Sequence, residues 1–198
     1  MHFVTIIIIP CNIYKNGNVA IKEYVNVMME PYDENTKISP YIALTKEQIE
    51  QLYQKYNEES LHVKYDITEF VKEYLGYDMD NYGNATSVHN KDCFYDWYVI
   101  GGRWSGSLYN DYNLGREDSK DQTEINCIKV KKFLNIYHDN KQKYLYNVII
   151  DKDGKLHKNF EISETYAELY TTDEWKLKYE SILENAIGNY IIILDCHN

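Results

Sequence analysis

The chain has 198 residues, with 44% hydrophobic residues, 26% charged residues and a formal net charge of −10. This length and composition suit one globular domain spanning residues 1–198. The acidic balance argues against binding along a DNA or RNA backbone, which needs clustered lysine and arginine, and against an anionic membrane surface. No apolar run approaches the roughly 20 residues that a membrane-spanning helix needs.

The cysteines are widely separated along the chain. Cys11, Cys93, Cys127 and Cys196 form no Cys-x-x-Cys pair, so their spacing predicts neither a zinc ribbon nor a redox motif. Scattered cysteines are typical of thiols in a reducing compartment. The apolar run near residue 3 lacks the basic flank and small-residue cleavage site of a signal peptide. We therefore expect a cytoplasmic protein.

Apolar strands are expected near both ends of the sequence. Residues 3–9 are apolar except for Thr5 and end at Pro10, and residues 190–194 form another apolar run. Both are too hydrophobic for an exposed sheet edge, so we expect them to be neighbours in one sheet. If they pair antiparallel, His2 lies near residues 195–197. If they pair parallel, His2 and residues 195–197 are a strand length apart.

Helices are expected between these strands. The helix-start signals are Thr45-x-x-Gln48, Asp66-x-x-Glu69 and Thr171-x-x-Glu174. Residues 19–29 are apolar-rich and fit either a helix or a strand. The pair at 153–154, Asp-Gly, predicts a hairpin turn between strands at 144–150 and 155–160. This order indicates an α+β fold, with an antiparallel or mixed sheet that contains both terminal strands and helices packed mainly on one face.

The segment from Cys93 to Leu108 is expected to be an aromatic, glycine-flanked loop that binds a ligand. Paired glycines let a ligand approach the backbone closely, arginine offers a planar donor fork for phosphate, and tryptophan offers a stacking surface for a base. The ligand-binding candidates are Trp97, Tyr98, Gly101, Gly102, Arg103, Trp104 and Ser105. The alternative is structural: the tryptophans pack in the core, the glycines form a turn, and the arginine pairs with Asp96. The spacing fits neither a dinucleotide fingerprint nor a Walker loop.

A second candidate site lies at the last strand. The period of two places Asp195 and His197 on one strand face, and His2 joins them if the terminal strands are antiparallel. Two histidines and a carboxylate can act as acid and base, or bind a divalent metal; no other cofactor is indicated. The alternative is that these are surface residues of a frayed end. His157 follows the hairpin turn and is expected to be an exposed strand residue.

Several blocks of the sequence resemble a family of uncharacterised proteins that is common in bacteriophages and scattered in bacteria. The blocks are His2-Phe3-Val4-Thr5, Pro31 to Asn35, Tyr95 to Gly106, Asp151 to His157, and Leu194-Asp195-Cys196-His197. The Tyr95 to Gly106 block is long and specific, whereas the interval from Tyr41 to Cys93 matches poorly, so helices there are an elaboration. The resemblance implies a phage or prophage origin and one compact domain, but it implies no reaction.

Three functions follow as hypotheses. The first is a phage accessory protein in the host cytoplasm that binds a small anionic, nucleotide-like ligand and sequesters a host immune signal. The second is a phosphodiesterase or related hydrolase that uses His2, Asp195 and His197 with Arg103. The third is a protein-binding inhibitor of a host factor that uses the acidic surface. The sequence leaves the oligomeric state open, a homo-oligomer included.

Overall fold

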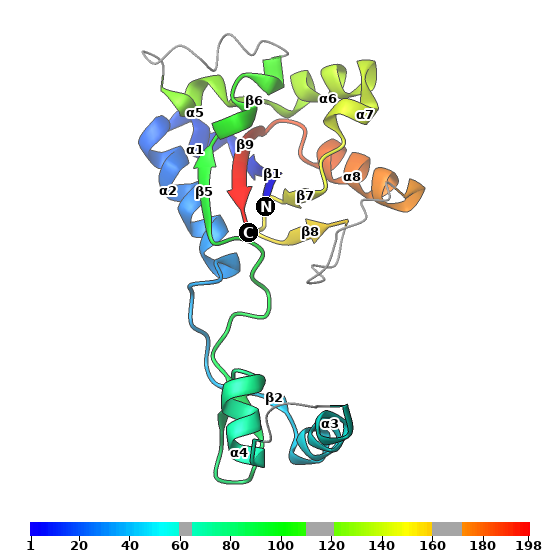
Figure 1. Cartoon of the computed structure of the whole chain (residues 1–198). Helices are drawn as coiled ribbons and strands as arrows, with labels where there is room; N and C mark the ends of the chain where they lie inside the picture. Colours follow the sequence, from blue (N-terminus) through cyan, green and yellow to red (C-terminus); the bar gives the residue numbers. More distant parts are fainter. Residues whose placement is uncertain (60–64, 110–120, 160–171) are drawn as a thin grey trace. The chain divides into compact units, whose positions relative to one another are not determined.

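The computed structural model describes residues 1–59, 65–109, 121–159 and 172–198. The chain divides into two compact units (Figure 1). Unit 1 comprises Met1–Asp33 and Asp92–Asn198, and unit 2 comprises Glu34–Lys91. The single domain expected over residues 1–198 stays a prediction, since compact units of this kind can belong to one folding domain or to two.

Unit 1 is built on a mixed sheet, as the sequence predicts. Within the described residues it has six strands in the order β5-β9-β1-β7-β8, and β6 also pairs with β9. The strands are β1 (His2–Ile9), β5 (Trp97–Ile100), β6 (Cys127–Lys129), β7 (Val148–Ile150), β8 (Leu156–Lys158) and β9 (Tyr190–His197). The β1 and β7 strands run parallel, and the other pairs are antiparallel.

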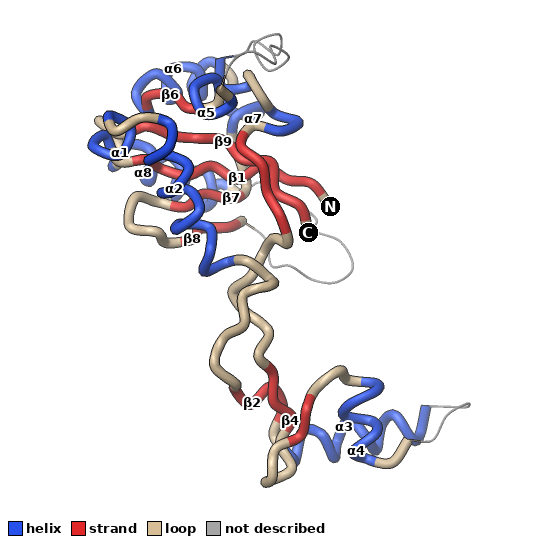
Figure 2. Tube along the Cα trace, turned by 90° about the vertical axis from the view of Figure 1, so that its left-hand side faces the viewer, coloured by secondary structure: helices blue, strands red, loops and turns tan. Residues whose placement is uncertain are grey.

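The two terminal strands are neighbours, and they pair antiparallel over their whole length. The register runs from His2 opposite His197 to Ile9 opposite Tyr190. The N and C ends therefore lie side by side, as both views show (Figures 1 and 2). The expectation that the terminal strands share one sheet is confirmed, and of the two possible directions the structure has the one that brings His2 to residue 197.

Helices cover both faces of the sheet rather than mainly one. The helices of unit 1 are α1 (Cys11–Lys15), α2 (Asn18–Met29), α5 (Gln122–Ile125), α6 (Val130–Asp139), α7 (Lys141–Tyr144) and α8 (Asp173–Asn185), with short 3-10 turns at Glu30–Tyr32, Gly102–Trp104 and Ser107–Tyr109. Ile6 and Ile8 pack with α6 and α8 on one face, and Ile7 and Ile9 pack with α2 on the other. Because β1 is apolar on both faces, both need cover. None of the described helices is long and apolar enough to cross a membrane.

Several elements of unit 1 differ from their sequence-based predictions. The Cys93 to Leu108 segment is not all loop: residues 97–100 form β5, because Trp-Tyr-Val-Ile has high strand propensity and pairs with β9. The strand expected at 144–150 begins at Val148. Thr172 caps α8 through the backbone N–H of Trp175, one residue later than expected. His157 is buried, not exposed, and its Nε2 lies 2.8 Å from a carboxylate oxygen of Asp151.

Unit 2 has its own small sheet and core. Its strands, in the order β2-β4-β3, are β2 (Tyr41–Leu44), β3 (Asp78–Met79) and β4 (Ala85–Ser87). Its helices are α3 (Lys46–Glu59) and α4 (Ile67–Glu69), which continues as a π-helical turn at Phe70–Tyr74. Both capping boxes predicted here are present, at Thr45 and at Asp66. Its buried core consists of Ile49, Phe70, Val71 and Ala85.

Candidate functional site

The histidines at the two ends of the sequence meet on one face of the unit 1 sheet. His2 is directly opposite His197 in the β1–β9 pair, and their ring centroids are 5.0 Å apart. On the other side of β9, Trp97 is opposite His197, and the two rings stack at 5.3 Å with an interplanar angle of 11°. Three neighbouring strands thus each contribute one ring to a common surface.

Each of the two histidines is held by its own carboxylate. The Nδ1 atom of His2 lies 2.8 Å from Oδ1 of Asp195, and Nδ1 of His197 lies 2.9 Å from Oδ1 of Asp96. An ionised carboxylate only accepts hydrogen bonds, so both Nδ1 atoms donate and each ring presents Nε2 for other contacts. The α-amino group of Met1 lies 3.4 Å from Nε2 of His197.

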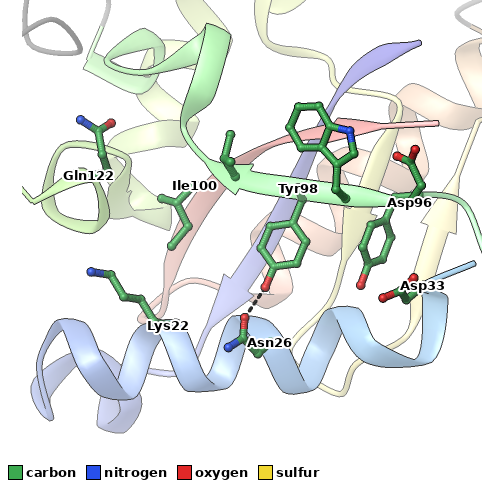
Figure 3. A pocket seen from close by; sticks show the side chains of 10 residues that line it. Lys22, Asn26, Asp33, Asp96, Tyr98, Ile100 and Gln122 are labelled. Carbon is green, nitrogen blue, oxygen red and sulfur yellow. Dashed lines mark hydrogen bonds between the residues drawn. The ribbon is translucent and has the colours of Figure 1, made fainter. Parts of the chain in front are cut away.

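A β-bulge at the start of β5 explains how Asp96 reaches the histidine. The backbone N–H of Asp96 donates to the carbonyl of His197 at 3.0 Å, although the register partner of His197 is Trp97. Two residues therefore oppose one, which turns both side chains toward the same face of the sheet. Figure 3 shows Asp96 on the opposite side of β5 from Tyr98. The structural alternative for this segment paired Asp96 with Arg103, whereas the structure pairs it with His197.

The two carboxylates have different surroundings. Burial raises the pKa of Asp96, but the hydrogen bond and the charge of His197 outweigh this effect, so the pKa lies below its ordinary value. The side chain of Asp195 is 3% exposed, and its second oxygen accepts the backbone N–H of Arg103 at 3.0 Å. Asp195 thus links β9 to the turn that follows β5.

The paired glycines allow this turn to wrap around two polar side chains. Gly101 and Gly102 have φ angles of 74° and 50°. A Cβ atom on Gly102 would lie 2.4 Å from the Cβ of Asp195, and one on Gly101 would lie 2.2 Å from Nδ2 of Asn126. Only glycine tolerates both the positive φ and the close approach. The glycines therefore bring the backbone close to residues of the protein itself.

The remaining ligand-binding candidates divide into exposed and internal residues. Arg103 is exposed, and its guanidinium makes no hydrogen bond or ion pair with the described part of the chain. Trp104 packs against the core. Ser105 is buried, donates to Gln122 at 2.8 Å and accepts from Asn126 at 2.9 Å. Arg103 can contact a ligand, whereas the hydroxyl of Ser105 is committed to internal hydrogen bonds.

An open groove of about 550 Å³ lies along the outer edge of β5 (Figure 3). Of the ligand-binding candidates, Trp97 and Tyr98 line it, and the other five do not. Lys22 and Asn26 of α2 form its opposite wall. Burial raises the pKa of the Tyr98 hydroxyl to about 12, so this group stays protonated and donates to Oδ1 of Asn26. Asp96 and Trp97 also line the groove. It therefore begins beside the surface formed by the rings of His2, His197 and Trp97.

Sequence reasoning brought together His2, Asp195 and His197, but it missed two residues. The contact of Asp96 with His197 was not anticipated, because a bulge cannot be read from a short strand pattern. Asn126 was missed because a single buried amide has no sequence signature. Within the described residues, no group of three or more His, Cys, Asp or Glu side chains is arranged to hold a metal ion. The divalent metal stays a prediction.

Comparison with known proteins leaves the geometry as the basis for function, since no family model, curated protein or solved structure matches this chain.

Proposed function

We propose that this protein binds a small anionic, nucleotide-like ligand against the surface formed by His2, His197 and Trp97, and hydrolyses a phosphate ester there. The observation that carries the proposal is the pair of histidine–carboxylate contacts on adjacent strands, with the imidazole centroids 5.0 Å apart. A histidine oriented through Nδ1 by a carboxylate is the usual arrangement of a general acid or base.

The proposed reaction uses the two imidazoles in complementary protonation states. A neutral histidine takes a proton from water through Nε2 while the water oxygen forms a bond to phosphorus. The second, protonated histidine donates its Nε2 proton to the leaving oxygen as the phosphorus–oxygen bond breaks. Asp195 and Asp96 keep each ring in the tautomer that this transfer requires and stabilise the imidazolium form.

Exposed groups beside the histidines supply binding. The Trp97 side chain is 42% exposed, and a base can stack on the part of its ring that His197 leaves uncovered. Arg103 is exposed one residue beyond Gly102, and its guanidinium suits a phosphate. These two groups also favour a second candidate function, in which the protein sequesters the ligand without cleaving it. The resemblance to phage proteins supports an accessory role of either kind in host cytoplasm, directed at a host immune signal.

The test is turnover and binding measured separately on an untagged chain, because both chain ends lie at the site. A panel of linear dinucleotides, cyclic mononucleotides and cyclic dinucleotides is incubated with the protein and analysed by chromatography, and binding is measured by calorimetry. The variants are His2→Gln, His197→Gln, Asp195→Asn and Asp96→Asn. We expect a bell-shaped pH dependence and a loss of turnover of about 100-fold or more in each histidine variant with binding retained.

The control is His138→Gln, which removes a histidine from α6, outside the site. It should turn over the panel like the unsubstituted chain. Binding without turnover in the unsubstituted chain would select sequestration over hydrolysis. If no member of the panel is bound or cleaved, the proposal is wrong.

A further inference from the structure

Strand β5 has an outer edge that no other strand in the described part of the chain covers. Within the described residues it pairs with β9 on one side only, and it ends the strand order of the sheet. Its four residues, Trp97-Tyr98-Val99-Ile100, carry no charge and no proline. Proteins normally protect such an edge with charged residues, proline or a covering segment. Here Trp97 and Val99 are instead 42% and 44% exposed.

The backbone of β5 has hydrogen-bonding groups directed away from the sheet. The N–H of Gly101 donates to Ile193 on β9 at 2.9 Å. Backbone groups alternate between the two sides of a strand, so Val99 shares the side of Gly101, and Tyr98 and Ile100 direct their N–H and C=O groups to the open edge. An added strand would pair with these two residues.

Backbone pairing also occurs just before β5 in the chain. Asp33 forms a parallel bridge with Tyr95, and the N–H of Phe94 donates to the carbonyl of Tyr32 at 3.0 Å. Residues 94–95 thus pair with an extended segment of the protein itself directly before β5.

The groove beside β5 can hold the side chains of an added strand. It holds about 550 Å³ between the edge and α2, within the range of sites that bind small ligands and short peptides. Figure 3 shows Lys22, Asn26 and Tyr98 directed into this space. Side chains on one face of an added strand would enter the groove, and those on the other face would lie beside Trp97 and Val99.

Charge indicates the kind of segment that fits. Asp33 and Asp96 lie at the start of the groove, where Asp96 also pairs with His197, and Lys22, toward its other end, pairs with Asp121 at 3.0 Å. The whole chain carries a formal charge of −10. A basic partner is attracted to such a protein, and two copies of the chain repel each other.

We propose that β5 is a docking edge for an extended segment of a partner protein, which adds to the sheet as a further strand. The segment has uncharged side chains opposite Tyr98 and Ile100 and a lysine or arginine over Asp33 and Asp96. Backbone pairing provides affinity, and the groove provides side-chain specificity. The segment pairs with the edge of β5 that faces away from His197, although Asp96 and Trp97 line the groove and also belong to the surface proposed for hydrolysis.

The first test is hydrogen exchange by NMR on the untagged chain, with and without a peptide selected from a random heptapeptide display library. The amides of Tyr98 and Ile100 should exchange freely in the protein alone and become protected when the peptide binds. Those of Val99 and Gly101 should be protected in both states. Backbone N-methylation along the peptide should weaken binding about tenfold at alternate positions, because only alternate N–H groups face β5.

The second test places a charge on the edge. Val99→Lys should weaken peptide binding at least about tenfold, as edge lysines block strand addition, whereas Val27→Lys, on the exposed part of α2, should leave it unchanged. A library that yields no peptide dependent on Val99, or peptides that tolerate N-methylation at every position, would overturn the proposal. So would a dimer in sedimentation velocity that Val99→Lys dissociates, because the occupant would then be a second copy.

Discussion

The carboxylate of Asp96 accepts a hydrogen bond from Nδ1 of His197 at 2.9 Å, across the bulge that begins β5. Folding lowers the pKa of this carboxyl group because the hydrogen bond and the charge of His197 outweigh the opposing effect of burial. The pair therefore links the protonation of the site to the stability of the fold.

Replacing His197 with alanine should raise the pKa of Asp96, since burial remains and the histidine's contribution is lost. A carboxyl group whose pKa is lower in the folded state stabilises the protein above its unfolded pKa, and this contribution disappears as the pH falls through the folded pKa. The stability advantage of the unsubstituted chain over His197→Ala should therefore shrink with acidification. Carbon-13 NMR titration of Asp96 checks the pKa, and urea unfolding at several pH values checks the linkage. An unchanged Asp96 titration would contradict the pairing.

Gly102→Ala should destabilise unit 1 strongly, because the new Cβ would lie 2.4 Å from the Cβ of Asp195 at a φ of 50°. Gly188→Ala is the matched control, since it has a φ of 103° in the same unit and nothing within 4 Å of the new atom. We expect a loss of roughly 1–2 kcal/mol for the control and about 1–3 kcal/mol more for Gly102→Ala. Denaturant unfolding measures both, and equal losses would mean that the turn has room to relax away from Asp195.

Asn126→Ala should remove the internal support of the glycine turn. The side chain accepts from the N–H of Gly106 at 3.0 Å and donates to Ser105 and to the carbonyl of Gln122. Leaving buried partners unsatisfied costs about 1–3 kcal/mol for each group. Asn185→Ala removes an exposed amide and should cost less than about 0.5 kcal/mol. Similar melting temperatures for the two variants would show that the network contributes little.

The buried thiols should be unreactive in the folded protein. Burial raises the pKa of Cys127 and of Cys196 to about 12, so almost no thiolate forms near neutral pH. Iodoacetamide at about pH 8 should modify both thiols only after unfolding, whereas partly exposed Cys11 should react in the native state. Mass spectrometry of the alkylated peptides gives the order of reaction. Rapid native labelling of Cys196 would show that β9 opens readily.

Much of the fold could be predicted from local patterns. The apolar run at residues 3–9 and the run at 190–194 identified the paired strands, and the capping boxes at Thr45 and Asp66 identified helix starts, because these signals involve neighbouring residues. Two helices were harder to find. The α2 pattern of Ile21, Val25 and Met29 was ambiguous beside other apolar residues, and α6 was missed although its buried residues recur at helical spacing.

The candidate site could be predicted only in part. Strand periodicity placed Asp195 and His197 on one face, and antiparallel pairing then added His2. The partner of His197 depended on the bulge at Asp96, a feature of pairing between distant segments rather than of local sequence. The role of the glycines was likewise set by Asp195 and Asn126, which follow them in the chain by many residues.

Strand β9 pairs with β1, β5 and β6, yet its residues 190–197 are synthesised after all of these partners. On the ribosome, the isoleucines of β1 therefore lack this partner strand until residues 190–197 have emerged. Contacts of such large sequence separation form slowly, and uncovered apolar strands are prone to aggregation and chaperone binding. Neither histidine–carboxylate pair can form until β9 has emerged, so a nascent chain that ends before β9 lacks both pairs.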